Sequence, residues 1–146
     1  YIAGIDLSEE MLGICARKKM TDDLYQADIE SDGLPFEDHS FDAIVSSGVF
    51  ETFKDKGSVL REIARVLKPG GAFSFTDFAG GIFGIGARKI ASETVQNALE
   101  SSSLFLNERT KFVAYKQGFL NLGKAYYYCY SGIKEENPFQ MPSAEI

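Results

Sequence analysis

The sequence predicts an α/β fold, with helices flanking a mostly parallel sheet and an antiparallel strand pair near the C-terminus. Short apolar runs alternate with helical periodicity over residues 1–78, the spacing typical of right-handed crossovers between parallel strands. Acidic or small residues follow these runs, where parallel sheets present ligand-binding groups. Aromatic and β-branched residues then form two runs joined by a turn, which indicates paired antiparallel strands.

Length, composition and net charge indicate how many domains to expect and which classes of partner to exclude. With 146 residues, 45% of them hydrophobic, we expect one domain over residues 1–134 and a loose tail over residues 135–146. The net charge of −6 argues against nucleic acid and anionic membrane as partners, because phosphate binding needs clustered basic residues. The sequence shows neither an apolar run of about 20 residues nor a charged-then-apolar leader, so we expect a cytoplasmic protein.

The cysteine pattern does not predict a metal centre. Cys15 and Cys129 lie far apart, and neither has the neighbours of a zinc site or a redox pair. We therefore expect two packed, reduced thiols and no metal.

The first element is a strand followed by a helix. Tyr1 to Ile5 is predicted to be a buried strand that ends at Asp6. Ser8 is a typical helix cap, and it begins a predicted helix over residues 8–20. The apolar face of this helix comprises Met11, Leu12, Cys15 and Ala16.

Two further strands follow. Leu24 to Ala27 is predicted to be a brief strand ending at Asp28, before a loop that contains residues 31–35. Phe41 to Ser46 is predicted to be a buried central strand. Its end is marked by Ser47 and Gly48, small residues that let the backbone approach a ligand closely.

The middle of the chain predicts a helix and a fourth strand. Helical spacing over residues 55–67 ends at the turn of residues 68–71, and a strand over residues 72–76 then ends at Asp77. Glu51, Lys54 and Asp55 are interpreted as a solvated helix start. The inward positions of the helix are Val59, Leu60, Ile63, Val66 and Leu67.

The C-terminal half begins with a glycine-rich stretch over residues 80–86. A helix is predicted over residues 87–99, and strands are predicted over residues 110–116 and 124–130. The inward positions of this helix are Ile90, Val95, Ala98 and Leu99. The tyrosines of residues 126–130 are explained by alternation along a strand.

Four segments, in this order, resemble the class I S-adenosylmethionine-dependent methyltransferases of the small-molecule type. They are GIDLSEEML from Gly4, Asp28 after a strand, LPFEDHSFDAI from Leu34, and LREIARVLKPGG from Leu60. The resemblance implies a Rossmann-like sheet, S-adenosylmethionine as cofactor and a small-molecule methyl acceptor.

The resemblance also implies roles for residues at the adenosine end of the cofactor. Asp6 would accept hydrogen bonds from the ribose diol, because a carboxylate has two acceptor oxygens. Leu7 and Met11 would pack near the adenine or the ribose. Asp28 would accept from the adenine amine, with the backbone N–H of Ile29 facing a ring nitrogen.

At the methionine end, the resemblance implies contacts from Ser46, Ser47 and Gly48, with Phe50 flanking the sulfonium in a cation–π arrangement. Acceptor contacts are expected from residues 78–86. No catalytic residue is assigned, since methyl transfer from a sulfonium is accelerated mainly by positioning. His39 falls at a variable loop position and is interpreted as solvated.

In this family a strand and a glycine-rich turn precede the acid that corresponds to Asp6, and they do not occur in the sequence. We therefore expect a sheet lacking the usual first strand, and weak or absent cofactor binding by the 146-residue chain alone.

Three interpretations remain open from the sequence. An acid after a strand is also typical of a helix cap, so the acids alone do not establish an enzyme. A non-catalytic relative completed by a partner chain is the main alternative to a methyltransferase. A dinucleotide-dependent oxidoreductase is disfavoured, because the loop at residues 34–41 and the turn at residues 68–71 follow the methyltransferase pattern. The acceptor and the oligomeric state are not predicted.

Overall fold

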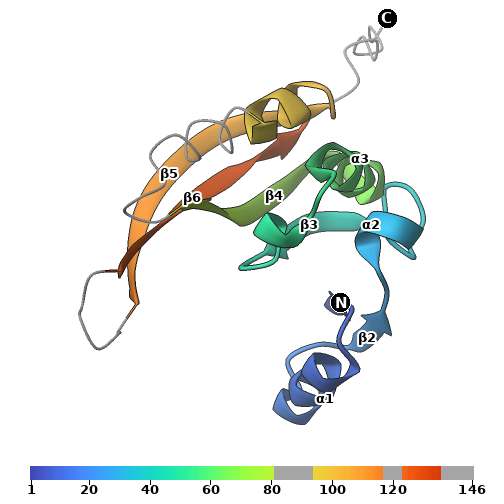
Figure 1. Cartoon of the computed structure of the whole chain (residues 1–146). Coiled ribbons are helices and arrows are strands. Elements are labelled where there is room, and N and C mark those ends of the chain that lie inside the picture. The colour runs from blue at the N-terminus through green and yellow to red at the C-terminus, as the bar shows by residue number, and fades with distance from the viewer. Residues whose placement is uncertain (81–93, 117–122, 136–146) are drawn as a thin grey trace, which may run out of the picture. The chain divides into compact units, whose positions relative to one another are not determined.

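The computed structural model describes residues 1–80, 94–116 and 123–135, whose strands form two sheets. The chain divides into two compact units, Tyr1–Phe36 and Glu37–Ile146, and the residue-number colour bar of Figure 1 locates the elements of each. The first unit holds a two-stranded sheet, and the second holds a four-stranded sheet. Among the described residues, none of the helices combines the length and the apolar character needed to cross a bilayer.

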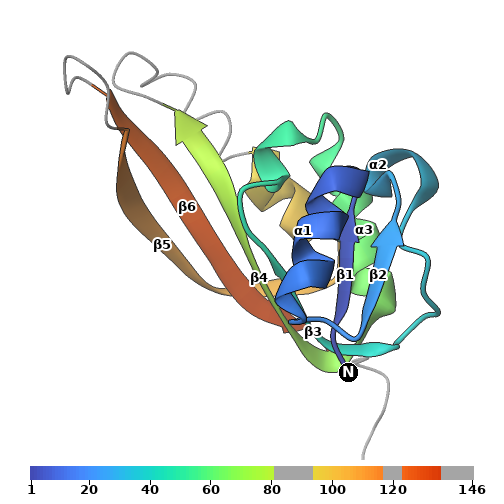
Figure 2. The same ribbon diagram turned by 90° about the horizontal axis from the view of Figure 1, so that it is seen from below.

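The first unit contains two parallel strands, a helix that contacts both, and a short second helix. Strand β1 (Ala3–Asp6) pairs with β2 (Asp23–Gln26), and Asp6 lies opposite Gln26 at the carboxyl end. Helix α1 (Glu9–Lys18) lies beside the pair in Figure 2. The hydroxyl of Ser8 accepts from the N–H of Met11, and this confirms the predicted cap.

Burial in the first unit is lower than the sequence predicted. Tyr1 and Ile2 are exposed and β1 is only half-buried, so the prediction of a buried strand over residues 1–5 was wrong. On α1, Leu12 and Cys15 are half-buried, whereas Met11 is 47% exposed. The reason is geometric, because strands of four residues with one helix cannot enclose a side chain on all sides.

A short helix, α2 (Ile29–Asp32), replaces part of the predicted loop. Asp28 caps it by accepting from the N–H groups of Glu30 and Ser31. The ring of Phe36 then meets the ring of Tyr25 edge-on, with 5.0 Å between their centroids. This contact ties the end of the unit back to β2.

The second unit has strand order β3-β4-β6-β5. Strand β3 (Phe41–Ser46) runs parallel to β4 (Leu67–Gly80). Strands β5 (Leu104–Lys116) and β6 (Gly123–Lys134) form the predicted antiparallel pair, longer than expected, and curve together in Figure 1. Among the described strands β3 pairs only with β4, and Val45 is 79% exposed, so the prediction of a buried central strand was wrong.

The predicted turn of residues 68–71 lies inside β4 as an irregularity in the ladder. Phe41 is paired with Leu67 and Ala43 with Ala72, so β4 has more residues than β3 over the same stretch. Gly70 has φ of 76°, a conformation that favours glycine. The strand therefore begins earlier than the predicted Ala72.

The core lies in the second unit. Its helical side chains come from α3 (Lys56–Val66), the short η1 helix (Phe50–Thr52) and a helix over residues 94–100. The ring of Phe75 stacks on Phe50 at 4.0 Å and on Tyr130 at 5.1 Å between centroids. The buried apolar residues are Phe50, Val59, Leu60, Ile63, Ala64, Val66, Leu67, Phe73, Phe75, Val95, Leu99, Leu104 and Tyr130.

These positions confirm the predicted inward face of α3. In the later helix Val95 and Leu99 are buried as predicted, whereas Ala98 is half-buried. Asp55 caps α3 by accepting from the N–H of Ser58 at 3.0 Å. His39 is exposed, yet its Nδ1 lies 3.0 Å from the Leu67 carbonyl and 3.0 Å from the Lys134 ammonium. Ile90, the glycine-rich residues 81–86, the turn at residues 117–122 and the tail at residues 136–146 lie outside the described residues.

Candidate functional site

In the first unit the two predicted acids come to one end of the two-stranded sheet. Asp6 is the last residue of β1, and Asp28 lies two residues beyond the end of the parallel strand β2. The carbonyl of Asp6 accepts from the N–H of Ala27 at 3.3 Å, which holds the two strand ends together. Carboxyl ends of parallel strands are where open α/β sheets bind ligands.

One oxygen of the Asp6 carboxylate is already held. Its Oδ1 accepts from the N–H of Ser8 at 2.8 Å, just before α1 begins. Within the described part of the chain, Oδ2 makes no hydrogen bond or ion pair. The carboxylate is thus oriented by one bond and keeps an acceptor oxygen for a ligand diol, so the residue fits the predicted ribose contact.

Exposed apolar side chains accompany Asp6. Leu7 is 65% exposed and Met11 is 47% exposed. The carbonyl of Leu7 accepts from the side-chain amide of Gln26 at 3.1 Å, which fixes the backbone after β1. A flat apolar group such as an adenine would bury these two side chains, whose exposure otherwise costs free energy.

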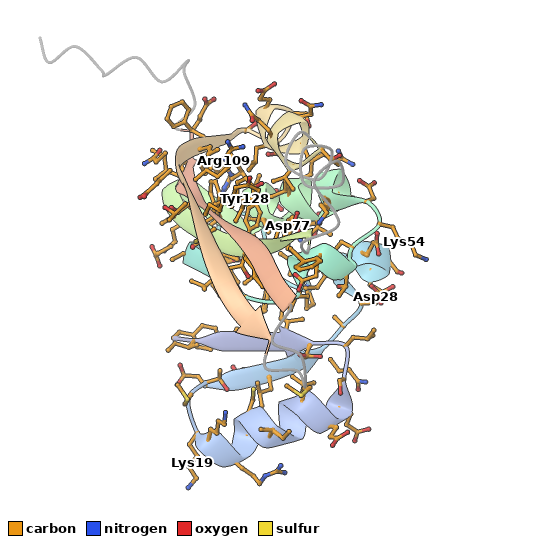
Figure 3. The ribbon with its side chains drawn as sticks, turned by 60° about the vertical axis from the view of Figure 1, so that its left-hand side comes forward. Lys19, Asp28, Lys54, Asp77, Arg109 and Tyr128 are labelled. Carbon is orange, nitrogen blue, oxygen red and sulfur yellow. The ribbon has the colours of Figure 1, made fainter. Side chains whose placement is uncertain are left out.

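Asp28 has a structural function in addition to its predicted one. Its Oδ1 accepts from Glu30 N–H at 3.1 Å and from Ser31 N–H at 3.3 Å, and its Oδ2 accepts from Ser31 Oγ at 2.9 Å. Figure 3 labels Asp28 at the start of α2. Ile29 is the first residue of that helix, so its N–H has no acceptor within the helix, as the predicted contact with an adenine nitrogen requires.

In the second unit the predicted methionine-end residues follow β3. Ser46 is the last residue of β3 and pairs with Phe75 of β4. Ser47 and Gly48 are exposed, and the N–H of Gly48 donates to Thr76 Oγ1 at 2.9 Å. Gly48 has φ of 74° and open space where a Cβ would stand, so its conformation rather than crowding favours glycine.

Phe50, which was predicted to flank the sulfonium, is fully buried. Its ring stacks on Phe75, and the ring of Phe53 meets it edge-on at 5.5 Å between centroids. The cation beside this ring is the ammonium of Lys56, 5.5 Å from the centroid. Contact between Phe50 and a sulfonium stays a prediction, and the structure shows the ring anchored in the core.

Three charged residues near Phe50 were not among the predicted site residues. Lys56 Nζ donates to Asp77 Oδ1 at 2.6 Å and to the Phe50 carbonyl at 2.9 Å. Glu51 was interpreted as solvated, but its Oε2 is buried and has no hydrogen-bond partner among the described residues. A basic residue opening a helix, against its dipole, was the available signal for Lys56.

The displaced pKa values belong to residues outside the predicted site. A hydrogen bond from the Lys68 ammonium holds the pKa of Asp42 below its ordinary value. Hydrogen bonds to Glu62 and then Asp38 raise the pKa of Arg65. Burial lowers the pKa of Lys134, against the opposing field of Asp38.

Comparisons with known proteins show the family to which the chain belongs. A family model described as "Methyltransferase domain" matches residues 1–75. Among curated proteins, the chain is 33% identical over 88 residues to the ubiquinone/menaquinone biosynthesis C-methyltransferase UbiE of Wigglesworthia glossinidia brevipalpis. That match covers 57% of this chain and 35% of the relative, and the chain spans about a third of the length of the curated relatives it matches.

Solved structures share the fold at low sequence identity. An S-adenosylmethionine-dependent methyltransferase from Mesorhizobium loti has a TM-score of 0.68 at 21% identity, covering 91% of this chain and 80% of that one. The N-methyltransferase NodS of Bradyrhizobium japonicum, in complex with S-adenosyl-L-homocysteine, has a TM-score of 0.63 at 21% identity, covering 92% and 66%. Because the family model matches just over half of the 146 residues, the chain belongs to the class I S-adenosylmethionine-dependent methyltransferase family.

Proposed function

We propose that the full-length protein transfers a methyl group from S-adenosylmethionine to a small-molecule acceptor. The observation that carries the proposal is the Asp6 carboxylate at the carboxyl end of β1. One of its oxygens is fixed by Ser8 N–H and the other is left to accept from a ligand. Family membership supports the cofactor, and the net charge of −6 disfavours a nucleic-acid acceptor.

The adenosine end of the cofactor is assigned to the first unit. Asp6 holds the ribose hydroxyls, Leu7 and Met11 cover an apolar face, and Asp28 with Ile29 N–H takes the adenine edge. Asp28 can do this while capping α2, because each carboxylate oxygen carries two lone pairs. The amine-specific contact would distinguish adenine from a base that lacks this donor.

The methionine end is assigned to Ser46, Ser47 and Gly48, with Phe50 anchoring the segment. Small exposed residues leave the backbone accessible after β3. The bond from Gly48 N–H to Thr76 and the burial of Phe50 fix this backbone at both ends. Bound S-adenosylmethionine would supply an activated methyl group. These residues would hold it in line with the acceptor, and such positioning supplies about 7–11 kcal/mol in favourable cases.

A second candidate function is a non-catalytic module that pairs with a strand of a partner chain. It is favoured by the sheet edges, because among the described strands β1 pairs only with β2 and β3 only with β4. Unpaired edges of this kind are templates for strand addition. This candidate requires no cofactor, which separates it from the methyltransferase.

Titration calorimetry on the full-length protein tests the proposal, because weak or absent binding is expected of the 146-residue chain alone. We expect S-adenosylmethionine and S-adenosylhomocysteine to bind and NAD to give no signal. Absence of binding by both sulfur ligands would leave the strand-pairing module as the better explanation. Preference for NAD would favour an oxidoreductase instead.

A further inference from the structure

Lys56 lies at the centre of a buried polar cluster beside the segment that follows β3. Its ammonium donates to Asp77 Oδ1 at 2.6 Å and to the carbonyl of Phe50 at 2.9 Å. The Lys56 side chain is 13% exposed and the Asp77 side chain is 3% exposed. Lys56 is thus an ion-pair partner and also holds η1 against the end of β4.

Both charges stand where local rules disfavour them. Lys56 is the first residue of α3, where the helix macrodipole favours an anion. Asp77 follows Phe73 and Phe75 on the alternating face of β4 that is otherwise buried and aromatic. Positions that break local rules without a local gain are typical of functional sites.

Stability alone explains this pair poorly. Replacing both members of a buried ion pair by apolar residues is often neutral or stabilising, because the desolvation of the two charges offsets their attraction. The apolar contacts of Phe50, Phe73 and Phe75 already hold this region together. Lys56 supplies the ammonium that holds the Phe50 carbonyl, and Asp77 supplies a negative charge that offsets it.

The pair adjoins the predicted methionine end of the cofactor. Phe75 pairs with Ser46, and Thr76, next to Asp77, accepts from the N–H of Gly48. Lys56 in turn holds the carbonyl of Phe50. Asp77 is labelled in Figure 3, close to Tyr128, which faces it across β4 and β6.

We propose that Asp77 preserves the binding of the cationic methyl donor relative to its neutral product by offsetting the charge of Lys56. The inference rests on the proposed function, which places a sulfonium beside residues 46–50. S-adenosylmethionine carries a positive sulfur, and S-adenosylhomocysteine carries a neutral thioether in the same place. Lys56 fixes the segment but repels a sulfonium, and Asp77 cancels that repulsion.

The test measures the dissociation constants of both ligands in the full-length protein. The quantity compared is the dissociation constant of S-adenosylhomocysteine divided by that of S-adenosylmethionine. We expect Asp77→Asn to lower this ratio roughly three- to thirtyfold, since Lys56 is then uncompensated, and Lys56→Gln to raise it by a similar factor. The neutral double variant K56M/D77L should return it close to the wild-type value. A general destabilisation of the fold would weaken the binding of both ligands by the same factor and leave the ratio unchanged.

Lys68→Gln provides the matched control, because Lys68 pairs with the exposed Asp42 and should not alter the ratio. An unchanged ratio in both single variants, or a shift in the same direction, would overturn the inference. If one single variant does not fold, the other should still shift the ratio and the double variant should still return it close to the wild-type value. Failure of the wild type to bind either ligand would instead overturn the proposed function, and the inference with it.

Discussion

The two units of the chain differ in how their function-bearing residues are supported. Tyr1–Phe36 presents the Asp6 and Asp28 carboxylates, with Leu7 and Met11 exposed, and its strands and helices contain no fully buried residue. Glu37–Ile146 holds every buried apolar side chain of the described residues, and Phe50 is part of that core. The comparison teaches that the residues predicted at the adenosine end belong to a unit with little buried surface, whereas those predicted at the methionine end belong to the unit that holds the core. Low burial is expected where binding elements are of low local stability.

The largest expected effect is on the core of the second unit. Phe75→Ala removes a ring that stacks on both Phe50 and Tyr130, and we expect it to lower the free energy of unfolding by about 3–5 kcal/mol. Tyr25→Ala, a half-buried aromatic of the first unit, should cost about 1–2 kcal/mol. Urea denaturation compares the two. Equal costs would show that the first unit contributes a core of its own.

Replacing a glycine by alanine should change the stability of the protein in opposite directions in the two units. A Cβ at Gly132 of β6 would collide with the carbonyl of Phe105, so Gly132→Ala should destabilise the protein by about 1–3 kcal/mol. Gly13 lies inside α1 with only the end of Arg17 near a new Cβ, so Gly13→Ala should stabilise it by about 0.5–1 kcal/mol. Melting temperatures measured side by side check the signs, and a destabilising Gly13→Ala would contradict this description of α1.

At Asp28 the capping and ligand-binding functions can be separated. Asp28→Ala should cost about 1 kcal/mol of stability through loss of the α2 cap, whereas Asp28→Ser keeps a capping oxygen and should cost little. Both variants should weaken S-adenosylmethionine binding by about 1–3 kcal/mol, because neither offers the carboxylate to the adenine amine. Calorimetric binding by Asp28→Ser at wild-type strength would assign Asp28 to the cap alone.

The smallest effect is expected from the exposed Lys68–Asp42 pair. The hydrogen bond from Lys68 lowers the pKa of Asp42 in the folded protein, so its stabilising contribution is present above the ordinary carboxyl pKa of about 3.9. It is lost as the pH falls below that value, through the lowered pKa. Wild-type protein and Asp42→Asn should therefore differ slightly in melting temperature at pH 7 and converge as the pH falls through the lowered pKa of Asp42. A difference that grows on acidification would contradict the sign of this linkage.

Local features of the fold, including the buried face of α3, could be predicted from the sequence, whereas burial that depends on neighbouring strands could not. The helix from Lys56 to Val66 was predicted because its Asp55 cap and its apolar spacing are local signals. The exposure of Val45 depends on which strand lies beside β3, and apolar runs do not carry that information. Helix α2 was missed because a helix of four residues depends on a single side-chain cap.

The candidate site divides in the same way. Asp6 and Asp28 were predicted from their order along the chain, since both follow strands and match a family motif. The Lys56–Asp77 pair was missed because its members stand 21 residues apart and meet only through the packing of α3 and η1 against β4. The burial of Phe50 likewise depends on Phe75, a neighbour that the motif does not specify.

The most direct test of the central claim is calorimetric titration of S-adenosylmethionine into the whole protein and its Asp6→Asn variant. Asparagine can still accept from Ser8 N–H, so the variant keeps the local backbone bond and loses the charge and one acceptor oxygen. Glu10→Gln, an exposed acid of α1, is the control for net charge. We predict that Asp6→Asn weakens binding by about 1–3 kcal/mol while Glu10→Gln binds as the wild type does. Equal affinity of Asp6→Asn and wild type would contradict the assignment of Asp6 to the cofactor.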